Sequence, residues 1–287
     1  EHDYVINLFK DHPGQRIFIP GNHDWERGRK NGWQHILDQE AYIEANMNRG
    51  NVYLPDGGGP GPVEVPLCDD IVLIVFDMQW FLQRHDKPGL KQLGFEKVQD
   101  FFVHFEDIIM RNQQKKIIVA SHHPLFSVGY HGGYFPVENS IFPLLERKNW
   151  LYIPLPGFIY TGYRKIFGHI QDIAHPKYKE VKDQLMEIMA RYPNTIYAAG
   201  HEHNLQYLQK QGIHHIVSGG GGEGTYISKR PKKADFAAAK PGYARIDFYD
   251  DGDAWITYIS PENSEAKEIF RTKLFNKKSF IETSKPD

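Results

Sequence analysis

The chain has 287 residues, of which 40% are hydrophobic and 24% are charged, and its formal net charge is −2. This length supplies a core for one large domain or two small ones, and the balanced charge excludes a strongly basic binder of polyanions. The single cysteine, Cys68, excludes an internal disulfide framework, and no apolar run of about 20 residues is present to form a transmembrane helix.

Apolar residues at helical spacing predict four helices along the chain. The chain opens inside the first of them without an initial Met, so we expect further residues upstream of Glu1. The strongest pattern is a stripe of phenylalanines in the third helix, which we interpret as core. The predicted helices cover residues 4–10, 33–47, 93–110 and 177–192.

Short apolar runs bounded by glycine, proline or polar turns predict strands. Two pairs of them form hairpins, 63–65 with 71–76 and 243–249 with 255–259. From Pro261 the chain turns polar and rich in lysine, so we expect one domain over residues 1–260 and a polar tail or linker over residues 261–287. The remaining predicted strands are residues 16–19, 116–120, 195–199, 206–208 and 213–217.

Three of these strands end in side chains that commonly bind metal ions. In open α/β sheets, ligands bind beyond the carboxyl ends of the strands, and imidazole is the commonest neutral metal ligand in proteins. The sequence therefore predicts that these residues converge on one site. They are Asn22 and His23 after the first strand, His122 and His123 after residues 116–120, and His201 and His203 after residues 195–199.

Several residues in or near these motifs have a structural explanation as an alternative to a role in the site. Asp24, next to His23, can cap a helix, and His123 is better explained as a residue behind or outside the site than as a ligand. His131 is open between a packing and a site role. Glu202 faces away from its flanking histidines in any extended loop, so we do not count it as a ligand.

Three segments resemble signature motifs of the calcineurin-like metallophosphoesterases. They are Gly21-Asn22-His23-Asp24, Val119-Ala120-Ser121-His122 and Gly200-His201-Glu202-His203. Residues 200–208 and the run from His122 to His131 are most similar to the purple, or tartrate-resistant, acid phosphatase branch. The resemblance covers about residues 13–260 and implies an α/β fold, a four-layer α/β/β/α sandwich with two packed mixed sheets.

The resemblance also implies a site and a reaction. It implies two metal ions, of iron, zinc or manganese, with Asn22, His122 and His201 as ligands of one ion and His203 as a ligand of the other. The expected reaction is hydrolysis of small-molecule phosphate monoesters by metal-bound hydroxide, and no nucleic acid is expected as a partner. The resemblance further implies His23 as the proton donor, Asp24 as its orienting partner and His131 as a substrate-binding histidine.

The first two motifs of the family, both built on Gly-Asp, are expected before Asn22 and are not found there. The Gly-Asp pair in this sequence, Gly252-Asp253, lies in a late hairpin turn. We expect that the chain is truncated at its front and that the fragment binds metal weakly. Two alternatives stay open: a non-catalytic module that keeps the fold, and a phosphodiesterase or nuclease of the same superfamily, which the lack of a basic, aromatic groove disfavours.

An aromatic insertion interrupts the resemblance over about residues 143–180, and its most aromatic part begins at Trp150 and ends at Ile170. Three roles are open for it: packing on the domain, a lid over the substrate, and contact with a membrane interface. The acid phosphatase resemblance favours an extracytoplasmic location.

Overall fold

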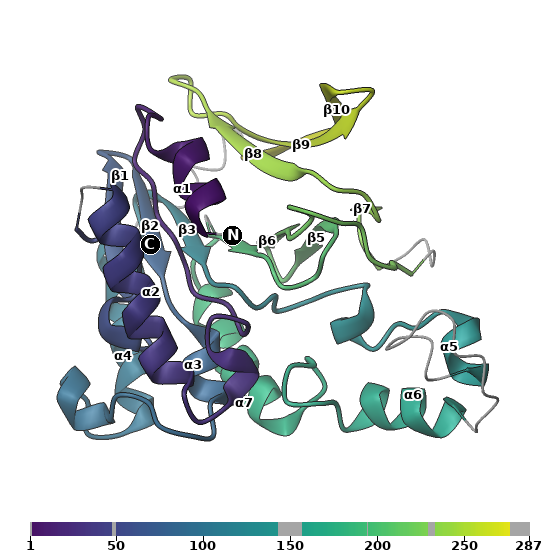
Figure 1. Ribbon diagram of the computed structural model, residues 1–287. Coiled ribbons are helices and arrows are strands. Elements are labelled where there is room, and N and C mark those ends of the chain that lie inside the picture. Colours follow the sequence, from purple (N-terminus) through teal and green to yellow (C-terminus); the bar gives the residue numbers. More distant parts are fainter. Residues whose placement is uncertain (1, 48–49, 143–156, 194, 229–232, 276–287) are drawn as a thin grey trace. The chain divides into compact units, whose positions relative to one another are not determined.

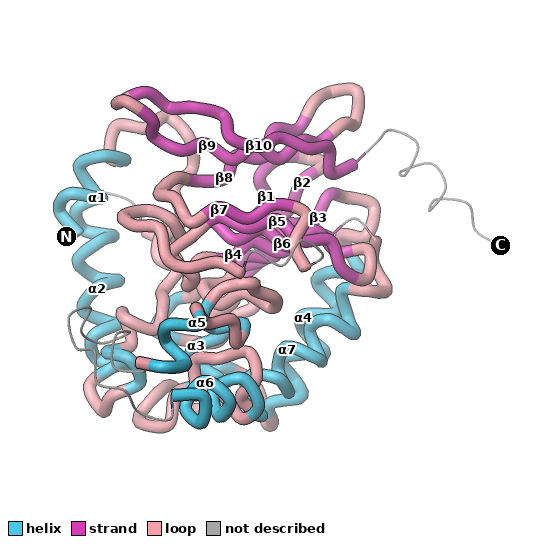
Figure 2. Tube along the Cα trace, turned by 90° about the vertical axis from the view of Figure 1, so that its right-hand side faces the viewer, coloured by secondary structure: helices cyan, strands magenta, loops and turns pink. Residues whose placement is uncertain are grey.

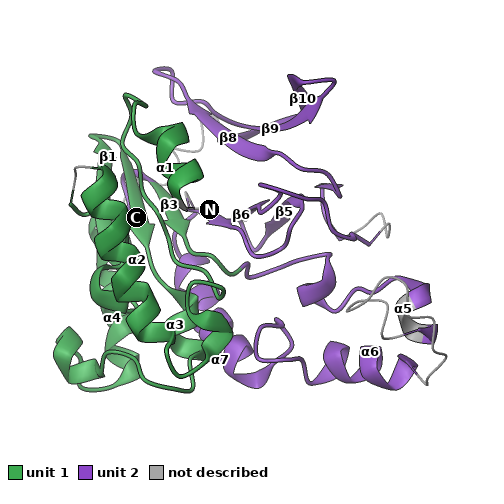
Figure 3. Cartoon of the chain, viewed as in Figure 1, with its two compact units in different colours: residues 1–112, 117–123 green, residues 113–116, 124–287 purple. Residues whose placement is uncertain are grey.

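A computed structural model describes residues 2–47, 50–142, 157–193, 195–228 and 233–275, and the chain divides into two compact units (Figure 3). Unit 1 comprises residues 1–112 and 117–123, and unit 2 comprises residues 113–116 and 124–287. Helices and strands occur in both units, which confirms the α/β class (Figures 1 and 2). Among the described helices, none has the length and apolarity that crossing a membrane requires.

The three helices predicted in unit 1 are present, the third with a later start, and a further short helix, α3 (Met78–Leu82), was not predicted. The predicted helix over 93–110 begins only at Val98, because Gly94 adopts a left-handed conformation (φ 79°) and the Asp100 carboxylate accepts hydrogen bonds from the backbone N–H groups of Glu96 and Lys97. The helices are α1 (His2–Phe9), α2 (Gly32–Met47), α3 (Met78–Leu82) and α4 (Val98–Arg111), with 3-10 turns η1 (Glu26–Gly28), η2 (Asp56–Gly58) and η3 (Leu90–Leu93).

The strands of unit 1 are β1 (Val63–Cys68), β2 (Ile71–Val75) and β3 (Lys116–Ala120), of which Lys116 is assigned to unit 2. β1 and β2 form the predicted antiparallel hairpin. β3 lies beside β2, since the Phe76 N–H donates to the Ala120 carbonyl at 3.1 Å. The phenylalanine stripe of α4 packs on this edge, with the rings of Phe101 and Phe105 each 6.1 Å from that of Phe76, which confirms its interpretation as core.

The prediction of a strand over residues 16–19 was wrong. Only Phe18 pairs, in a single parallel bridge to Tyr53. The bridge cannot extend because Pro20 lacks an N–H and Pro55 follows on the partner side. The apolar residues of this run still become core, because Ile17 and Ile19 pack on the cluster of Leu54, Val65 and Val75.

Unit 2 contains two sheets. In the first, β4 runs parallel to β6, and β5 pairs antiparallel with both β6 and β7, in the order β4-β6-β5-β7. The second sheet has the order β10-β9-β8 and is antiparallel over its described strands. The elements of the unit are η4 (Tyr130–Gly132), α5 (Val137–Ile141), α6 (Gly157–Ile166), α7 (Pro176–Met189), β4 (Thr195–Ala199), β5 (Leu205–Lys210), β6 (Ile213–Ser218), β7 (Phe236–Ala238), β8 (Tyr243–Phe248), β9 (Ala254–Glu262) and β10 (Glu265–Phe275).

The two sheets of unit 2 pack on each other through aromatic side chains. The Phe270 ring of β10 stacks on Phe236 of β7, with centroids 4.5 Å apart, and Tyr258 of β9 lies 5.0 Å from Phe236. The Tyr258 hydroxyl donates to the carbonyl of Gln206 in β5. These contacts agree with the sheet-on-sheet packing that the sandwich implies.

The polar tail predicted over residues 261–287 is wrong up to Phe275, because β10 occupies Glu265–Phe275. Asn263 and Ser264 both adopt positive φ (51° and 67°), so they form a tight turn between β9 and β10. The register of β10 shifts twice against β9, after Glu268 and after Lys273. These irregularities break the alternation of apolar and polar residues by which a strand is recognised in sequence.

Because Phe270 joins the two sheets, Phe270→Ala is expected to lower the free energy of unfolding by about 2 kcal/mol, less than the usual cost for a fully buried ring since Phe270 is only half-buried. Urea unfolding of the whole chain measures this change. Tyr243→Ala, which removes an exposed ring of β8, is the matched control and should cost clearly less. Equal and small effects of both substitutions would support a tail that contributes nothing to the fold.

Candidate active site

The first part of the candidate site is a turn in unit 1 at residues 20–24. The Asp24 carboxylate accepts the backbone N–H of Gly21 at 2.7 Å and so closes the turn. His23 is exposed, and Asn22 is half-buried. The contact of Asp24 explains how the turn keeps its shape. The predicted pairing of Asp24 with His23 stays a prediction.

Asn22 and His122 are brought together although they are 100 residues apart in sequence. The Asn22 Oδ1 atom lies 3.1 Å from the Nε2 atom of His122. The ring of His122 lies against the backbone of Gly21, where a β-carbon would be 2.6 Å from ring atoms. A glycine is therefore needed at position 21 for this histidine to reach the asparagine.

The spacing of this pair fits a shared metal ion. Two donors bound to one ion at about 2.1 Å and at a right angle lie about 3 Å apart, close to the separation of Asn22 Oδ1 and His122 Nε2. Both donors are neutral, and amide oxygen and imidazole nitrogen suit zinc, iron and manganese. Among the described residues, no group of three or more His, Cys, Asp and Glu side chains is placed to hold an ion.

A buried carboxylate supports this turn from behind. Asp77, which follows β2, accepts the indole N–H of Trp25 at 2.7 Å and the backbone N–H of Gln79 at 2.7 Å. Trp25 directly follows the turn of residues 20–24, so the bond holds the turn against β2. Burial raises the pKa of Asp77 to about 7, because the lowering by these hydrogen bonds is smaller than the cost of desolvation.

The His-x-His loop of unit 2 begins at the end of β4. The backbone adopts a left-handed conformation at His201, which has a φ of 63°. His201 is buried, and its Nε2 atom lies 3.3 Å from the carbonyl oxygen of Gln171. His203 is exposed, and its Nδ1 atom lies 2.7 Å from the Glu223 carboxylate, which leaves Nε2 to coordinate an ion.

The Glu202 carboxylate is engaged by the segment of residues 127–131, and its expected orientation away from the two histidines stays a prediction. The Glu202 side chain is buried and accepts hydrogen bonds from the Ser127 hydroxyl and, at 2.9 Å, from the backbone N–H of His131. Gly129 and Gly219 lie against it: a β-carbon on Gly129 would be 2.5 Å from Glu202 Oε2, and one on Gly219 would overlap the Glu202 carbonyl oxygen. Glu202 thus ties the segment of residues 127–131 to the His-x-His loop.

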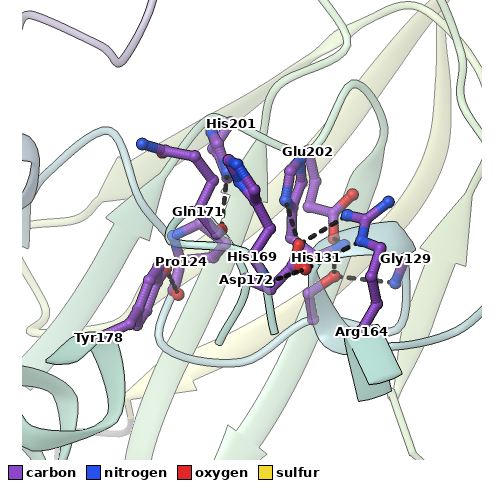
Figure 4. Close-up of polar contacts among 11 residues, drawn as sticks. Pro124, Gly129, His131, Arg164, His169, Gln171, Asp172, Tyr178, His201 and Glu202 are labelled. Carbon is purple, nitrogen blue, oxygen red and sulfur yellow. Dashed lines mark hydrogen bonds and ion pairs between the residues drawn. The ribbon is translucent and has the colours of Figure 1, made fainter. Parts of the chain in front are cut away.

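His131 lies beside His201, which supports a site role over simple packing. The two rings have centroids 4.0 Å apart, and the Nδ1 atom of His131 lies 3.0 Å from Asp172 Oδ1 (Figure 4). Arg164 of α6 grips the same carboxylate through Nε and Nη2, at 2.9 and 2.7 Å. Burial alone would raise the pKa of Asp172, but its hydrogen bonds to Arg164 and His131 and their charges lower it to about 2.

The sequence analysis did not identify Asp77, Asp172 or Arg164 as residues that support the candidate site. It also did not predict the structural role of Glu202. The position of Glu202 between two candidate ligands could have indicated that it belongs to the site region. Asp77 follows a predicted strand and precedes a short apolar helix, which is an N-cap signal. Asp172 and Arg164 belong to the region of the aromatic insertion and match no motif.

Within the most aromatic part of the insertion, residues 150–170, the structure describes one helix, α6. Trp150 and Tyr152 lie outside the described residues. One side of α6 carries the buried Thr161 and Arg164. The other side exposes apolar side chains, so packing explains only half of the helix and the lid and membrane roles stay predictions. The exposed residues are Phe158, Ile159, Tyr160, Tyr163 and Ile166.

Residues 1–220 match the calcineurin-like phosphoesterase family over three quarters of the chain, and the chain belongs to that family. The family predicted from the three motifs is thereby confirmed. Metal-assisted phosphoester chemistry is the property that defines this class.

Among curated proteins, human (Homo sapiens) tartrate-resistant acid phosphatase type 5 is 31% identical over 102 residues, which are 32% of this chain and 30% of that protein. The match therefore spans less than a third of the relative. This similarity agrees with the acid phosphatase branch that the motifs indicated.

Among solved structures, "GAP50 the anchor in the inner membrane complex of Plasmodium" has a TM-score of 0.50 at 12% identity and covers 98% of this chain and 87% of its own. The purple acid phosphatase PPD1 of yellow lupin (Lupinus luteus) seeds has a TM-score of 0.44 at 13% identity, covering 76% of this chain and 33% of that one. At 12% identity the likeness to the first of these structures shows the fold alone.

The raised pKa of Asp77 predicts a pH-dependent stability. With a pKa of about 7 in the folded state against 3.8 as the ordinary value, the folded state keeps a proton that the unfolded chain has lost. The stabilisation is complete below pH 3.8 and is lost as the pH rises through 7, by about 4 kcal/mol in total. Asp77→Asn should remove this dependence.

Urea unfolding of the unmutated protein and of D77N, from pH 5 to above pH 7, measures the difference. The gap between their free energies of unfolding should move in favour of D77N as the pH rises. Asp107→Asn, at an exposed position of α4, is the control and should follow the unmutated protein. If the free energies of unfolding of D77N and of the unmutated protein differ by the same amount at all pH values, Asp77 does not hold a proton in the folded state.

Proposed function

We propose that the protein is a metal-dependent phosphoric ester hydrolase that acts on small-molecule phosphate monoesters. The observation that carries the proposal is the pairing of Asn22 with His122 at 3.1 Å, a neutral donor pair at the spacing of two ligands of one ion. Membership in the calcineurin-like phosphoesterase family and the acid phosphatase similarity support it.

The family pattern assigns the donors as follows under this proposal. In that pattern Asn22, His122 and His201 would be ligands of one ion, and His203 would bind a second through the ring nitrogen that Glu223 does not engage. A carboxylate on the far nitrogen of a ligating histidine fixes its tautomer and raises its basicity. The carboxylates of the family's first two motifs are not among the 287 residues.

When bound, two such ions would supply positive charge for the phosphoryl oxygens and would activate a water molecule as the nucleophile. The protein residues do the rest. His23, exposed on a turn that Asp24 closes, gives a proton to the departing alkoxide. His131, held by Asp172, binds a phosphoryl oxygen.

A test compares metal content and hydrolysis of p-nitrophenyl phosphate in the unmutated protein and in variants, all made with the residues expected upstream of Glu1, because the fragment alone is expected to bind metal weakly. His122→Ala and Asn22→Ala should each lower the bound metal and reduce hydrolysis by at least about 100-fold, since even residues behind the ligands cost 10–100-fold. His104→Ala, an exposed histidine of α4, should change neither.

A folded protein that binds no metal and hydrolyses no phosphate ester would favour the other candidate, a non-catalytic module. This candidate would be supported if the residues upstream of Glu1 also lacked the two Gly-Asp motifs. Addition of a chelator separates the cases, because it should abolish a metal-dependent activity and leave the fold of unit 1 in place.

The role of His23 predicts a dependence on the leaving group. His23→Ala should reduce kcat by about 10²–10⁴-fold for an alkyl phosphate and by much less for p-nitrophenyl phosphate, because a proton donor matters most when the leaving oxygen is basic. Steady-state kinetics on a series of esters measures this. An equal loss for both kinds of ester would assign His23 a positional role.

A further inference from the structure

We propose that Asp172, locked in place by Arg164 of α6, is a positioning residue that holds the His131 ring by its Nδ1 atom and so selects Nε2 as the nitrogen that meets the phosphoryl group. The inference rests on the proposed function for its substrate. It assigns the insertion a part in the site: α6 carries the arginine that fixes the carboxylate.

The Asp172 carboxylate has no freedom to turn. Oδ1 lies 3.0 Å from His131 Nδ1 and 2.7 Å from Arg164 Nη2. Oδ2 accepts from Arg164 Nε at 2.9 Å and from the backbone N–H of His169 at 2.8 Å. Because both oxygens are engaged from two directions, rotation of the carboxylate breaks at least two charge-assisted hydrogen bonds.

Arg164 comes from α6 and is directed inward. Arg164 is 7% exposed, whereas the neighbouring Tyr163 and Lys165 are exposed. Its guanidinium also lies over the Phe135 ring, 5.0 Å from the centroid, on the segment that follows His131. A two-point grip by a planar guanidinium fixes the carboxylate plane, which a lysine in the same place cannot do.

His131 is held from three sides. Its backbone N–H donates to Glu202, its ring packs on His201, and its Nδ1 atom lies on Asp172 (Figure 4). In a neutral imidazole, a carboxylate at Nδ1 keeps the proton on that nitrogen. The Nε2 atom, on the opposite side of the ring, is then the atom left for the substrate.

A buried ion pair is weak evidence for stability, because desolvation offsets most of its attraction and an apolar pair of similar size can replace it. The Arg164–Asp172 pair is therefore expected to act mainly on the geometry of His131. If the two residues only stabilise the fold, both can be replaced together without loss of function. If they position His131, replacing both lowers the activity even when the stability is restored.

The experiment uses Asp172→Asn, Arg164→Met and the double variant R164M/D172N, with kinetics on a phosphate monoester, thermal unfolding, and the ring 15N shifts of His131 in labelled protein. Arg164→Met alone should destabilise, since it leaves a buried charge unpaired. The double variant should regain that stability and still show kcat lowered by about 10–100-fold, with KM changed much less. In D172N the His131 proton should spread over both ring nitrogens.

The exposed ion pair of α7 is the matched control, because Lys179 Nζ and Asp183 Oδ2 lie 2.6 Å apart on the surface. Lys179→Met/Asp183→Asn should change neither the shifts nor kcat. The inference is overturned if the double variant recovers full kcat, or if D172N keeps the His131 proton on Nδ1. A folded protein without phosphatase activity overturns the proposed function alone, since the 15N shifts still decide whether Asp172 fixes His131.

Discussion

The candidate site of unit 2 depends on the buried carboxylate of Glu202. It lies between the two histidines of the His-x-His loop and accepts hydrogen bonds from Ser127 and from the backbone of His131. An uncompensated carboxylate at this depth would be costly, so the segment of residues 127–131 must stay where its donors meet Glu202. The position of His131 is thus determined by a residue that performs no chemistry.

Unit 1 uses the same principle with a different group. Asp77 is buried behind the turn of residues 20–24 and holds Trp25 and the start of α3. The turn itself is closed by Asp24, and Gly21 gives His122 room to reach Asn22. In each unit, a short loop after an apolar run presents the candidate site residues, and a buried carboxyl group holds that loop in place.

The sequence predicted much of this arrangement, because periodicity and short motifs are local properties. The helices α2 and α7, the hairpins β1–β2 and β8–β9, and the positions of Asn22, His122, His201 and His203 after apolar runs follow from spacing alone. β10 was missed because two register shifts hide its alternation. Asp172 and Arg164 were missed because a buried ion pair depends on which segments meet in space, and nothing in the neighbouring residues records that.

The close packing of two glycines against Glu202 has an evolutionary consequence. Gly129, Glu202 and Gly219 lie far apart in the chain, yet neither glycine position has room for a β-carbon against Glu202. The two contacts differ in kind: a β-carbon at position 129 would meet the Glu202 side chain, whereas one at position 219 would meet its backbone carbonyl oxygen. A larger residue at position 129 therefore requires a smaller one at position 202, so these two positions should covary among related sequences, while position 219 should stay glycine whatever side chain stands at position 202.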